Sequence, residues 1–462
     1  MYPIILLSIT GLVTLFLGFL PSKRVLLPAT LLAFAVAFAV NLLEWNKPGV
    51  WFGEMHEISK LTLSFSAILL LTAFLIVGLT RSFSKNALAQ PAEYYAIMQF
   101  SLVGAMMMAG FGNLIMLFVG VEILSVAMYV LAGSDKQNIR GNEAALKYFL
   151  MGAFTTGILL FGIAMIYGAT GSFYLNDIQG VAMAEGDKPI HLYIGLTMLL
   201  IGLLFKVSAV PFHFWTPDVY DGSPTIFTAF MATIVKTAGF AAIYRILSVS
   251  FGSEYNFWFK MVLGIVVLTL VVSNITAVYQ QNFKRMLAFS SISHAGYLLL
   301  SIVGLSINSD NSILFYSLAY SLATVSAFGV LIAVSEEKLV DGRPDESIAS
   351  LNGLGKRSPL LAVVLTISML SMAGIPLTAG FWGKFFVFSD AASRGYIWLL
   401  VLAVLMSAVG IYYYFKPILA SWTKEGESGA IEISPIFKAV LLVSTILTIL
   451  LGLAPGLVRD LM

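Results

Sequence analysis

The sequence has no cysteine and few charged side chains, although it runs to 462 residues. Without cysteine, this chain can form no disulfide bond, no thiol nucleophile and no cysteine-ligated iron–sulfur cluster. Charged residues make up only 11% of the sequence, whereas soluble domains carry about 25%. The net charge of +2 gives no electrostatic basis for binding nucleic acid. The sequence shows no Walker-type loop, no dinucleotide fingerprint after a strand and no His-Glu-x-x-His motif, so we expect no cofactor or metal site in this chain.

Hydrophobic residues make up 59% of the sequence and gather in stretches about as long as a bilayer is thick. A transmembrane helix needs about 20 apolar residues, and the alternation typical of membrane strands is absent. We therefore predict an all-α polytopic membrane protein with about fourteen transmembrane helices. Only Gly110 and Gly112 separate the fourth span from the fifth, so the number could fall by one or two. The expected spans are 2–20, 25–43, 59–80, 93–110, 112–132, 144–168, 191–215, 224–250, 258–280, 285–305, 311–335, 359–389, 396–420 and 434–455.

The charges around the spans predict how the chain is oriented. Lys23 and Arg24 follow the first apolar stretch, whereas a signal peptide carries its charge before that stretch, so we expect the first span to be retained. Most Lys and Arg residues outside the spans lie in odd-numbered loops, which the positive-inside rule assigns to the cytoplasm. An even number of spans then places both termini on the periplasmic side. Length and span number favour a bacterial inner (plasma) membrane, and an organellar membrane is the alternative.

Two of the expected spans contain prolines that interrupt a helix. Pro211 lies in the seventh span, with Pro217 two residues beyond its expected end, and Pro376 lies in the twelfth. Proline removes a backbone hydrogen bond, and the freed carbonyls must find partners or water inside a bilayer. The two breaks are an odd number of spans apart, which predicts two inverted five-helix repeats. The expected divisions are an N-terminal three-helix segment at 1–90, a first unit at 91–250, a second unit at 251–425 and a C-terminal helix at 426–462.

Five ionisable side chains lie inside the expected spans, namely Glu122, Lys147, Lys206, Lys236 and Lys384. A lone Lys or Asp at a helix centre costs roughly 2.5–3.5 kcal/mol on insertion scales. Intramembrane charges of this kind mark ion or proton pathways. The sequence therefore predicts an interior path that holds charge, and protons are the expected cargo.

The use of lysine at all four cationic positions favours proton exchange over static pairing. Burial lowers the pKa of a lysine by up to ~3–5 units, whereas arginine stays charged. Two charges ~10 Å apart at an effective dielectric of ~20 interact by roughly 1.7 kcal/mol, enough for one proton to shift its neighbour's occupancy about tenfold. We expect Glu122 to pair with Lys147 or Lys206. The alternatives are a static pair that holds helices together, a snorkelling Lys147 and an interfacial Lys384.

Two histidines could bridge between the lysines, because histidine titrates near neutral pH. His213 follows the break at Pro211, and His294 lies among serines in the tenth span. The alternative for each is a satisfied core histidine. The polar loop at 335–358, which contains Glu346, is expected to be solvated or to contact a partner.

Two segments resemble the antiporter-like membrane subunits of respiratory complex I. They are Phe205-Lys-Val-Ser-Ala-Val-Pro-Phe-His-Phe-Trp-Thr-Pro-Asp-Val-Tyr220 and Lys284-Arg-Met-Leu-Ala-Phe-Ser-Ser-Ile-Ser-His-Ala-Gly-Tyr297. The His-Ala-Gly-Tyr ending favours the subunit N branch of bacterial NADH–quinone oxidoreductases over its L and M relatives. The L relative carries a lateral helix after the last span, which this sequence does not show, and the M relative usually has Glu where Lys384 stands. The resemblance covers most of the chain, and residues 1–90 are the least diagnostic.

The resemblance implies a fourteen-helix fold with two inverted five-helix units. It also implies a Glu122–Lys206 pair, a central Lys236, a terminal Lys384 and an additional Lys147. The expected function is proton translocation as a subunit of NADH–quinone oxidoreductase, a translocase whose NADH, FMN, iron–sulfur clusters and quinone belong to partner subunits. The expected neighbours are the antiporter-like M and small K subunits and the lipid bilayer. The alternatives are a subunit of a multisubunit sodium–proton antiporter and a purely structural membrane spacer.

Overall fold

The computed structural model describes residues 1–80, 91–337, 339–340, 343–426 and 429–459. These residues form two compact units of helices. The first unit takes described residues from 1–77, 83–215 and 234–264, and the second takes them from 78–82, 216–233 and 265–462.

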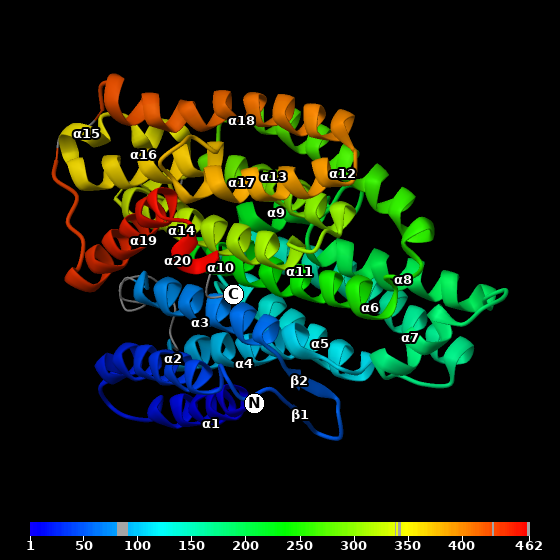
Figure 1. Ribbon diagram of the computed structural model, residues 1–462. Coiled ribbons are helices and arrows are strands. Elements are labelled where there is room, and N and C mark those ends of the chain that lie inside the picture. The colour runs from blue at the N-terminus through cyan, green and yellow to red at the C-terminus, as the bar shows by residue number, and fades with distance from the viewer. Residues whose placement is uncertain (81–90, 338, 341–342, 427–428, 460–462) are drawn as a thin grey trace. The chain divides into compact units, whose positions relative to one another are not determined.

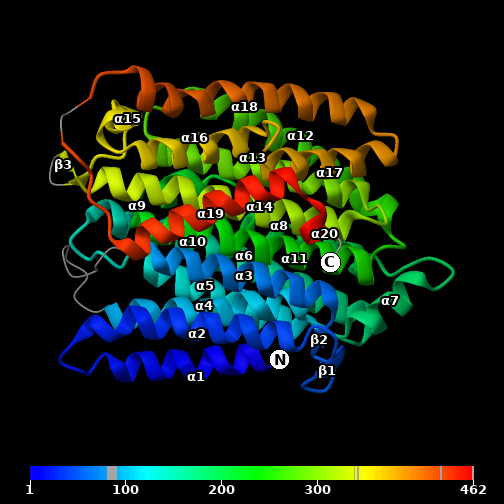
Figure 2. The same cartoon turned by 60° about the vertical axis from the view of Figure 1, so that its left-hand side comes forward.

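The first unit is almost entirely helical, and Figures 1 and 2 show α1, α2 and α4 side by side within it. Its elements are α1 (Tyr2–Leu17), η1 (Lys23–Val25), α2 (Leu26–Leu43), β1 (Gly49–Trp51), β2 (His56–Ile58), most of α3 (Lys60–Gly78), α4 (Pro91–Gly110), α5 (Leu114–Ala132), α6 (Ile139–Thr170), α7 (Leu175–Met183), α8 (Ile190–Lys206), α11 (Lys236–Arg245), η3 (Ile246–Ser250) and the start of α12 (Tyr255–Val278).

The second unit is also helical, and α14 packs against α16, α17 and α19 in its interior. Its elements are α9 (Trp215–Gly222), α10 (Thr225–Phe230), most of η2 (Met231–Val235), the rest of α12, α13 (Phe283–Gly304), α14 (Ser309–Ser335), β3 (Leu339–Val340), β4 (Arg343–Pro344), η4 (Ile348–Leu351), α15 (Leu354–Arg357), α16 (Pro359–Ala373), α17 (Ala379–Ser393), α18 (Ile397–Thr423), α19 (Pro435–Leu453) and α20 (Gly456–Arg459).

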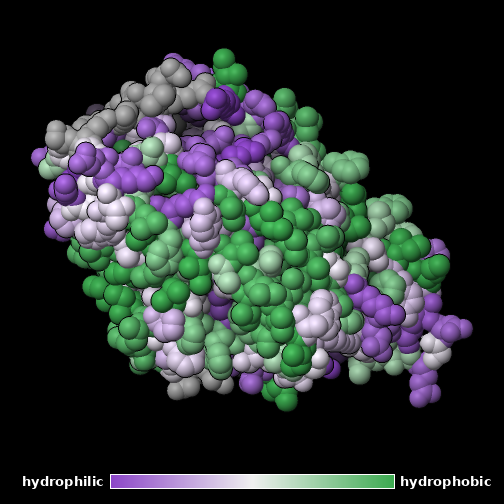
Figure 3. All heavy atoms as spheres, turned by 90° about the horizontal axis from the view of Figure 1, so that it is seen from above, coloured by the Kyte–Doolittle hydropathy of each residue, from purple (hydrophilic) through white to green (hydrophobic). Residues whose placement is uncertain are grey.

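The prediction of a polytopic helical membrane protein is confirmed. Ten helices in the described residues are long and apolar enough to cross a membrane, and α1, α8 and α16 are shorter apolar helices. The remaining predicted span coincides with α4. Apolar side chains cover the middle of the face in Figure 3, and hydrophilic ones gather towards its ends. Exposed apolar residues of this kind suit contact with lipid. On α18 they include Trp398, Val401, Leu405, Tyr412 and Trp422.

The fourth and fifth spans are separate helices, because the chain between them is capped and tied down. The side chain of Asn113 accepts a hydrogen bond of 2.8 Å from the backbone amide of Ile115, which satisfies one free donor at the start of α5. Gly112 passes so close to the β1–β2 hairpin that an added Cβ would lie 2.4 Å from the carbonyl oxygen of Glu54. Glycine is therefore required at this junction. The two short antiparallel strand pairs, β1–β2 and β3–β4, were not predicted.

Both predicted helix breaks are present, and at each break one backbone carbonyl accepts a hydrogen bond from a side chain. In the first unit, α8 ends at Lys206 and the indole nitrogen of Trp215 donates a hydrogen bond of 3.1 Å to the carbonyl of Phe205. In the second unit, α16 ends at Ala373, whose carbonyl accepts a hydrogen bond of 2.9 Å from Lys384 Nζ. Gly374 follows with a φ of +83°, a left-handed conformation that favours glycine. Each break thus holds a lysine beside it.

Candidate functional site

Lys206 is the last residue of α8, directly before the first break. Its ammonium donates a hydrogen bond of 2.8 Å to Ser125 Oγ and lies 3.4 Å from the hydroxyl of Tyr129. Ser125 and Tyr129 are four residues apart on α5, a spacing that places them on one face of the helix. Lys206 is therefore held by neutral hydroxyls in the interior of the first unit.

Glu122 lies on α5 nearly one turn before Ser125 and is half-buried. Its carboxylate attracts the Lys206 ammonium electrostatically. Lys147, on α6, forms an ion pair of 2.8 Å with Glu143 one turn earlier, and its side chain is 43% exposed. The structure thus brings Glu122 and Lys206 within electrostatic range and places Lys147 on an open face of the unit.

Lys236 begins α11, directly after the π-helical turn η2. Gly239, one turn later, packs against the break that follows α8. An added Cβ on Gly239 would lie 2.6 Å from Val207 Cγ1 and 4.0 Å from Lys206 Cβ. This close approach brings the start of α11 next to the end of α8. The two lysines therefore belong to neighbouring segments of one unit.

His213 lies in the non-helical chain between α8 and α9. The residue is buried, and its Nδ1 has no hydrogen-bond partner among the described residues. Its ring lies 4.5 Å from the ring of Phe214, measured between centroids. A buried ring nitrogen left open in this way can still accept or donate a proton.

His294 lies at the centre of a buried tyrosine cluster in the second unit. On α13, its Nδ1 is 2.7 Å from the hydroxyl of Tyr316 and its Nε2 is 3.1 Å from the hydroxyl of Tyr414. Tyr320 packs against the imidazole with a centroid distance of 4.6 Å. A small cavity beside the ring is bordered by His294, Tyr316, Ala319, Tyr320, Ala323, Ser371, Met372 and Gly380. His294 thus contacts a hydroxyl at each ring nitrogen.

Lys384 lies on α17, after the second break. Besides the carbonyl of Ala373, its ammonium donates a hydrogen bond of 2.8 Å to Ser407 Oγ on α18. It also lies 4.8 Å from the centre of the Tyr297 ring, a distance at which cation and ring attract. Lys384 and His294 both border Tyr297, because the histidine ring is 6.2 Å from it.

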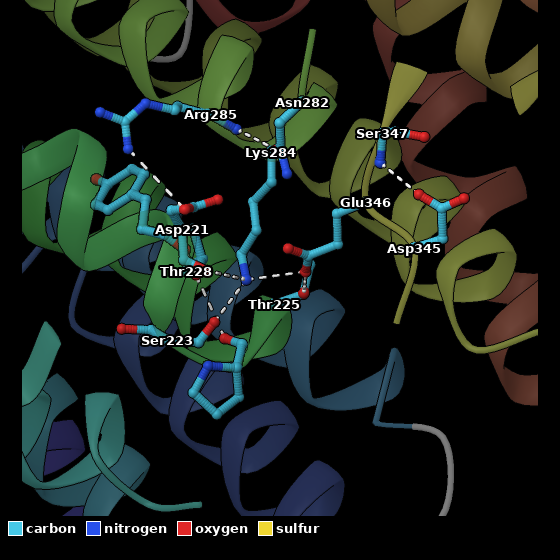
Figure 4. A network of polar contacts seen from close by, with 12 residues as sticks. Asp221, Ser223, Thr225, Thr228, Asn282, Lys284, Arg285, Asp345, Glu346 and Ser347 are labelled. Carbon is cyan, nitrogen blue, oxygen red and sulfur yellow. Dashed lines mark hydrogen bonds and ion pairs between the residues drawn. The ribbon is translucent and has the colours of Figure 1, made fainter. Parts of the chain in front are cut away.

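Sequence reasoning missed a buried ion pair in the second unit (Figure 4). The ammonium of Lys284 donates hydrogen bonds of 2.6 Å to the carbonyl of Ser223 and 2.9 Å to Glu346 Oε1. The same carboxylate oxygen accepts a hydrogen bond of 2.6 Å from the hydroxyl of Thr225. The expectation that this loop is solvated is wrong at Glu346, because its side chain is only 14% exposed and paired within the chain. Contact of the loop with a partner stays a prediction. Lys338 and Asp341 of the same loop lie outside the described residues.

Asp390 was also missed, because the twelfth span was expected to end at residue 389. Helix α17 continues to Ser393, and the Asp390 carboxylate is buried. A signal existed, since this carboxylate follows an apolar run that contains Phe385 and Phe388. In the part of the chain that the structure describes, no group of three or more Asp, Glu, His or Cys residues is arranged to hold a metal ion.

Comparison with known proteins agrees with this architecture. The family model described as "NADH:quinone oxidoreductase/Mrp antiporter, TM" matches residues 111–410. The NADH-quinone oxidoreductase subunit N of Flavobacterium psychrophilum is 38% identical over the whole length of both chains. That of Cytophaga hutchinsonii is 40% identical over 99% of this chain and 98% of its own.

Solved structures show the same relationship. A chain of respiratory complex I from Thermus thermophilus with bound aureothin is 37% identical, with a TM-score of 0.86 and coverage of 99% of this chain and 98% of its own. A chain of the Mrp complex from Dietzia sp. has a TM-score of 0.87 and covers 99% of this chain and 95% of its own, but it is only 20% identical and shares the fold alone. The chain therefore belongs to the family of NADH-quinone oxidoreductase subunit N, the antiporter-like membrane subunits of bacterial respiratory complex I.

Proposed function

We propose that this chain translocates protons across the bacterial inner membrane through its buried lysines and histidines. The observation that carries the proposal is the burial of three lysines inside membrane-spanning units. Lys206, Lys236 and Lys384 are 3%, 2% and 5% exposed. Intramembrane amines of this kind are costly and usually mark an ion or proton pathway.

The partners of two lysines support a change of protonation. Lys206 is hydrogen-bonded to Ser125 Oγ, and Lys384 is hydrogen-bonded to Ser407 Oγ. A hydroxyl accepts from an ammonium and donates to a neutral amine after a rotation. A carboxylate would instead hold the ammonium in its charged form. These hydroxyl contacts therefore accommodate a lysine before and after it releases its proton.

Charge coupling provides a means to drive that release. The half-buried Glu122 attracts the Lys206 ammonium, and a change in its charge would change the proton affinity of the lysine. Two charges ~10 Å apart at a dielectric of ~20 interact by roughly 1.7 kcal/mol, which exceeds the ~1.4 kcal/mol of a tenfold shift. In this proposal Glu122 sets the occupancy of Lys206, and Lys236 is the next group along the path.

The histidines extend the path. A neutral imidazole donates from one nitrogen and accepts at the other. His294 has a tyrosine hydroxyl at each nitrogen, so a tautomer exchange would move a proton from one side of the ring to the other. We assign His213 the same bridging role beside the first break and Lys384 the terminal role in the second unit. Lys147, on the open face, would act through its charge.

We further propose that electron transfer occurs in partner subunits, which bind NADH, FMN, iron–sulfur clusters and quinone. The antiporter-like M and small K subunits are the proposed neighbours, and both termini are proposed to face the periplasm. The sodium–proton antiporter alternative is not favoured. Relatives named subunit N are 38–40% identical over nearly the whole chain, whereas the Mrp chain shares only the fold.

The test compares proton uptake with NADH oxidation in membrane vesicles that contain the assembled complex. We expect Lys206→Met and Glu122→Gln to lower the number of protons moved per NADH oxidised, because each removes a charge that the path uses. Lys260→Met is the matched control, since Lys260 is exposed on α12. An unchanged ratio in both variants would refute the proposal. Sodium-dependent transport without an electron donor would favour the antiporter alternative.

A further inference from the structure

A second ionisable group accompanies Lys384 on α17. Asp390 follows Lys384 by six residues, which is about 9 Å along a helix axis, and both side chains are buried. The helix ends three residues later at Ser393. Carboxylates buried inside membrane-spanning helices are costly and commonly belong to proton paths. Asp390 therefore requires an explanation of its own.

The carboxylate of Asp390 is surrounded by serine hydroxyls. Its Oδ2 accepts a hydrogen bond of 2.7 Å from Ser301 Oγ, and its Oδ1 accepts one of 2.7 Å from Ser306 Oγ. Ser301 lies in the last turn of α13, and Ser306 lies in the loop between α13 and α14. Hydroxyls of this kind donate to a carboxylate and accept from a carboxylic acid. The surroundings thus suit both protonation states of Asp390.

Helix α13 connects this carboxylate to Lys384. Tyr297 lies beneath the Lys384 ammonium, and its buried hydroxyl has no hydrogen-bond partner among the described residues. Ser301 follows Tyr297 by four residues and so lies on the same face of α13, one turn along. Tyr297 and Ser301 therefore place two hydroxyls along the side of α13 that runs from Lys384 to Asp390.

The other side of Asp390 leads towards the surface. Ser306 is only partly buried, and Ile307 beside it is almost fully exposed. Arg394, directly after the end of α17, donates hydrogen bonds of 2.8 Å to the carbonyl of Gly304 and 3.2 Å to that of Leu305. The carboxylate thus lies between the buried lysine and a surface loop that a cation holds in place.

We propose that Asp390 is a proton-transfer residue at the surface end of the second unit, exchanging protons between Lys384 and the aqueous phase beside the α13–α14 loop. The inference rests on the proposed function. In the outward step, the Lys384 ammonium loses a proton and becomes an amine, and the Asp390 carboxylate gains it and becomes a carboxylic acid. The acid then gives the proton to bulk water and regains its charge. No electrons move in these steps.

The experiment measures protons moved per NADH oxidised in vesicles that contain the whole complex. We expect Asp390→Asn to lose as much of this ratio as Lys384→Met, because asparagine accepts hydrogen bonds but does not carry a proton. Asp390→Glu should restore most of the loss. If Lys384→Met lowers the ratio and Asp390→Asn leaves it unchanged, the inference is wrong and the proposed function stands. If both variants keep the wild-type ratio, the terminal role of Lys384 in the proposed function fails as well.

A second variant separates proton transfer from anchoring of the loop. Ser306→Ala removes the hydrogen bond between the Asp390 carboxylate and the α13–α14 loop, and it keeps both the carboxylate and Ser301. We expect it to retain more of the ratio than Asp390→Asn, and an equal loss would assign Asp390 a structural role and overturn the inference. If the Asp390→Asn complex does not assemble, the wild-type complex is treated instead with a carbodiimide, which reacts with protonated carboxyl groups. Labelling of Asp390 with loss of proton uptake supports the proposal, and no labelling overturns it.

Discussion

Replacement of Lys284 by methionine tests the ion pair that sequence reasoning missed. The variant removes hydrogen bonds of 2.6 Å to the carbonyl of Ser223 and 2.9 Å to Glu346. It also leaves the carboxylate of Glu346 buried, with the hydroxyl of Thr225 as its other donor. Removing one partner of a buried ion pair costs about 3–5 kcal/mol. Because the Glu346 side chain is 14% exposed and water can reach part of its charge, we expect a cost at the lower end of this range, about 3 kcal/mol.

A loss of about 3 kcal/mol in the free energy of unfolding raises the unfolding equilibrium constant roughly a hundredfold, because about 1.4 kcal/mol corresponds to a factor of ten. The assay is pulse proteolysis of this subunit in the purified complex across a series of SDS concentrations. The double variant Lys284→Met, Glu346→Gln removes the stranded charge as well, so it should be more stable than the single variant. Lys356→Met, at an exposed position, is the matched control. A single variant as stable as the wild type would refute the reasoning.

Three further predictions concern the first unit. Gly239→Leu should displace α11 from the break that follows α8, since even a Cβ would lie 2.6 Å from Val207 Cγ1. Proton uptake by vesicles should therefore fall. Uptake equal to that of the wild type would contradict this close packing. Asn113→Ala should destabilise the subunit by about 1 kcal/mol, because the variant loses the N-terminal cap of α5. The measurement is again pulse proteolysis across SDS concentrations. Asn113→Ser keeps a capping hydroxyl and should retain most of the wild-type stability. Burial, with the positive charges of the terminal amine and Arg245, lowers the pKa of His56 from 6.5 to about 3. Unfolding therefore takes up a proton at His56, so its contribution to folding stability is fully present above pH 6.5 and is lost as pH falls towards 3. The SDS concentration at which half of the subunit is unfolded should fall less between pH 7 and pH 5 in His56→Gln than in the wild type. An equal fall in both proteins would contradict this role of His56.

Most of the fold could be predicted from local properties of the sequence. Apolar stretches of sufficient length correspond to helices because backbone groups inside a bilayer must bond within their own segment. Proline located both breaks for the same reason, since it removes one of those bonds. The β1–β2 hairpin and the π-helical turn η2 were not predicted. Both depend on packing between segments, which a hydropathy pattern does not contain.

The candidate site was predicted only in part. Lys206 and Lys236 were predicted to be buried because each lies in the middle of a span, whereas Lys384 was expected either inside the twelfth span or at the interface. The structure buries all three. Lys147 also lies in an apolar stretch, yet its side chain is exposed, because the face that a long helix such as α6 turns inward is decided by its neighbours. Hydropathy alone does not distinguish these cases.

The sequence by itself determined that the chain is a helical membrane protein, where its helices break, and which amines lie within the spans. These properties follow from transfer of residues into lipid, which depends on each segment alone. Only the tertiary structure decided which groups meet. Lys284 and Glu346 are 62 positions apart in sequence, and Ser301 and Asp390 are 89 apart. Such pairs depend on how helices pack, and a polar group buried by that packing takes whatever partner the neighbouring helix provides.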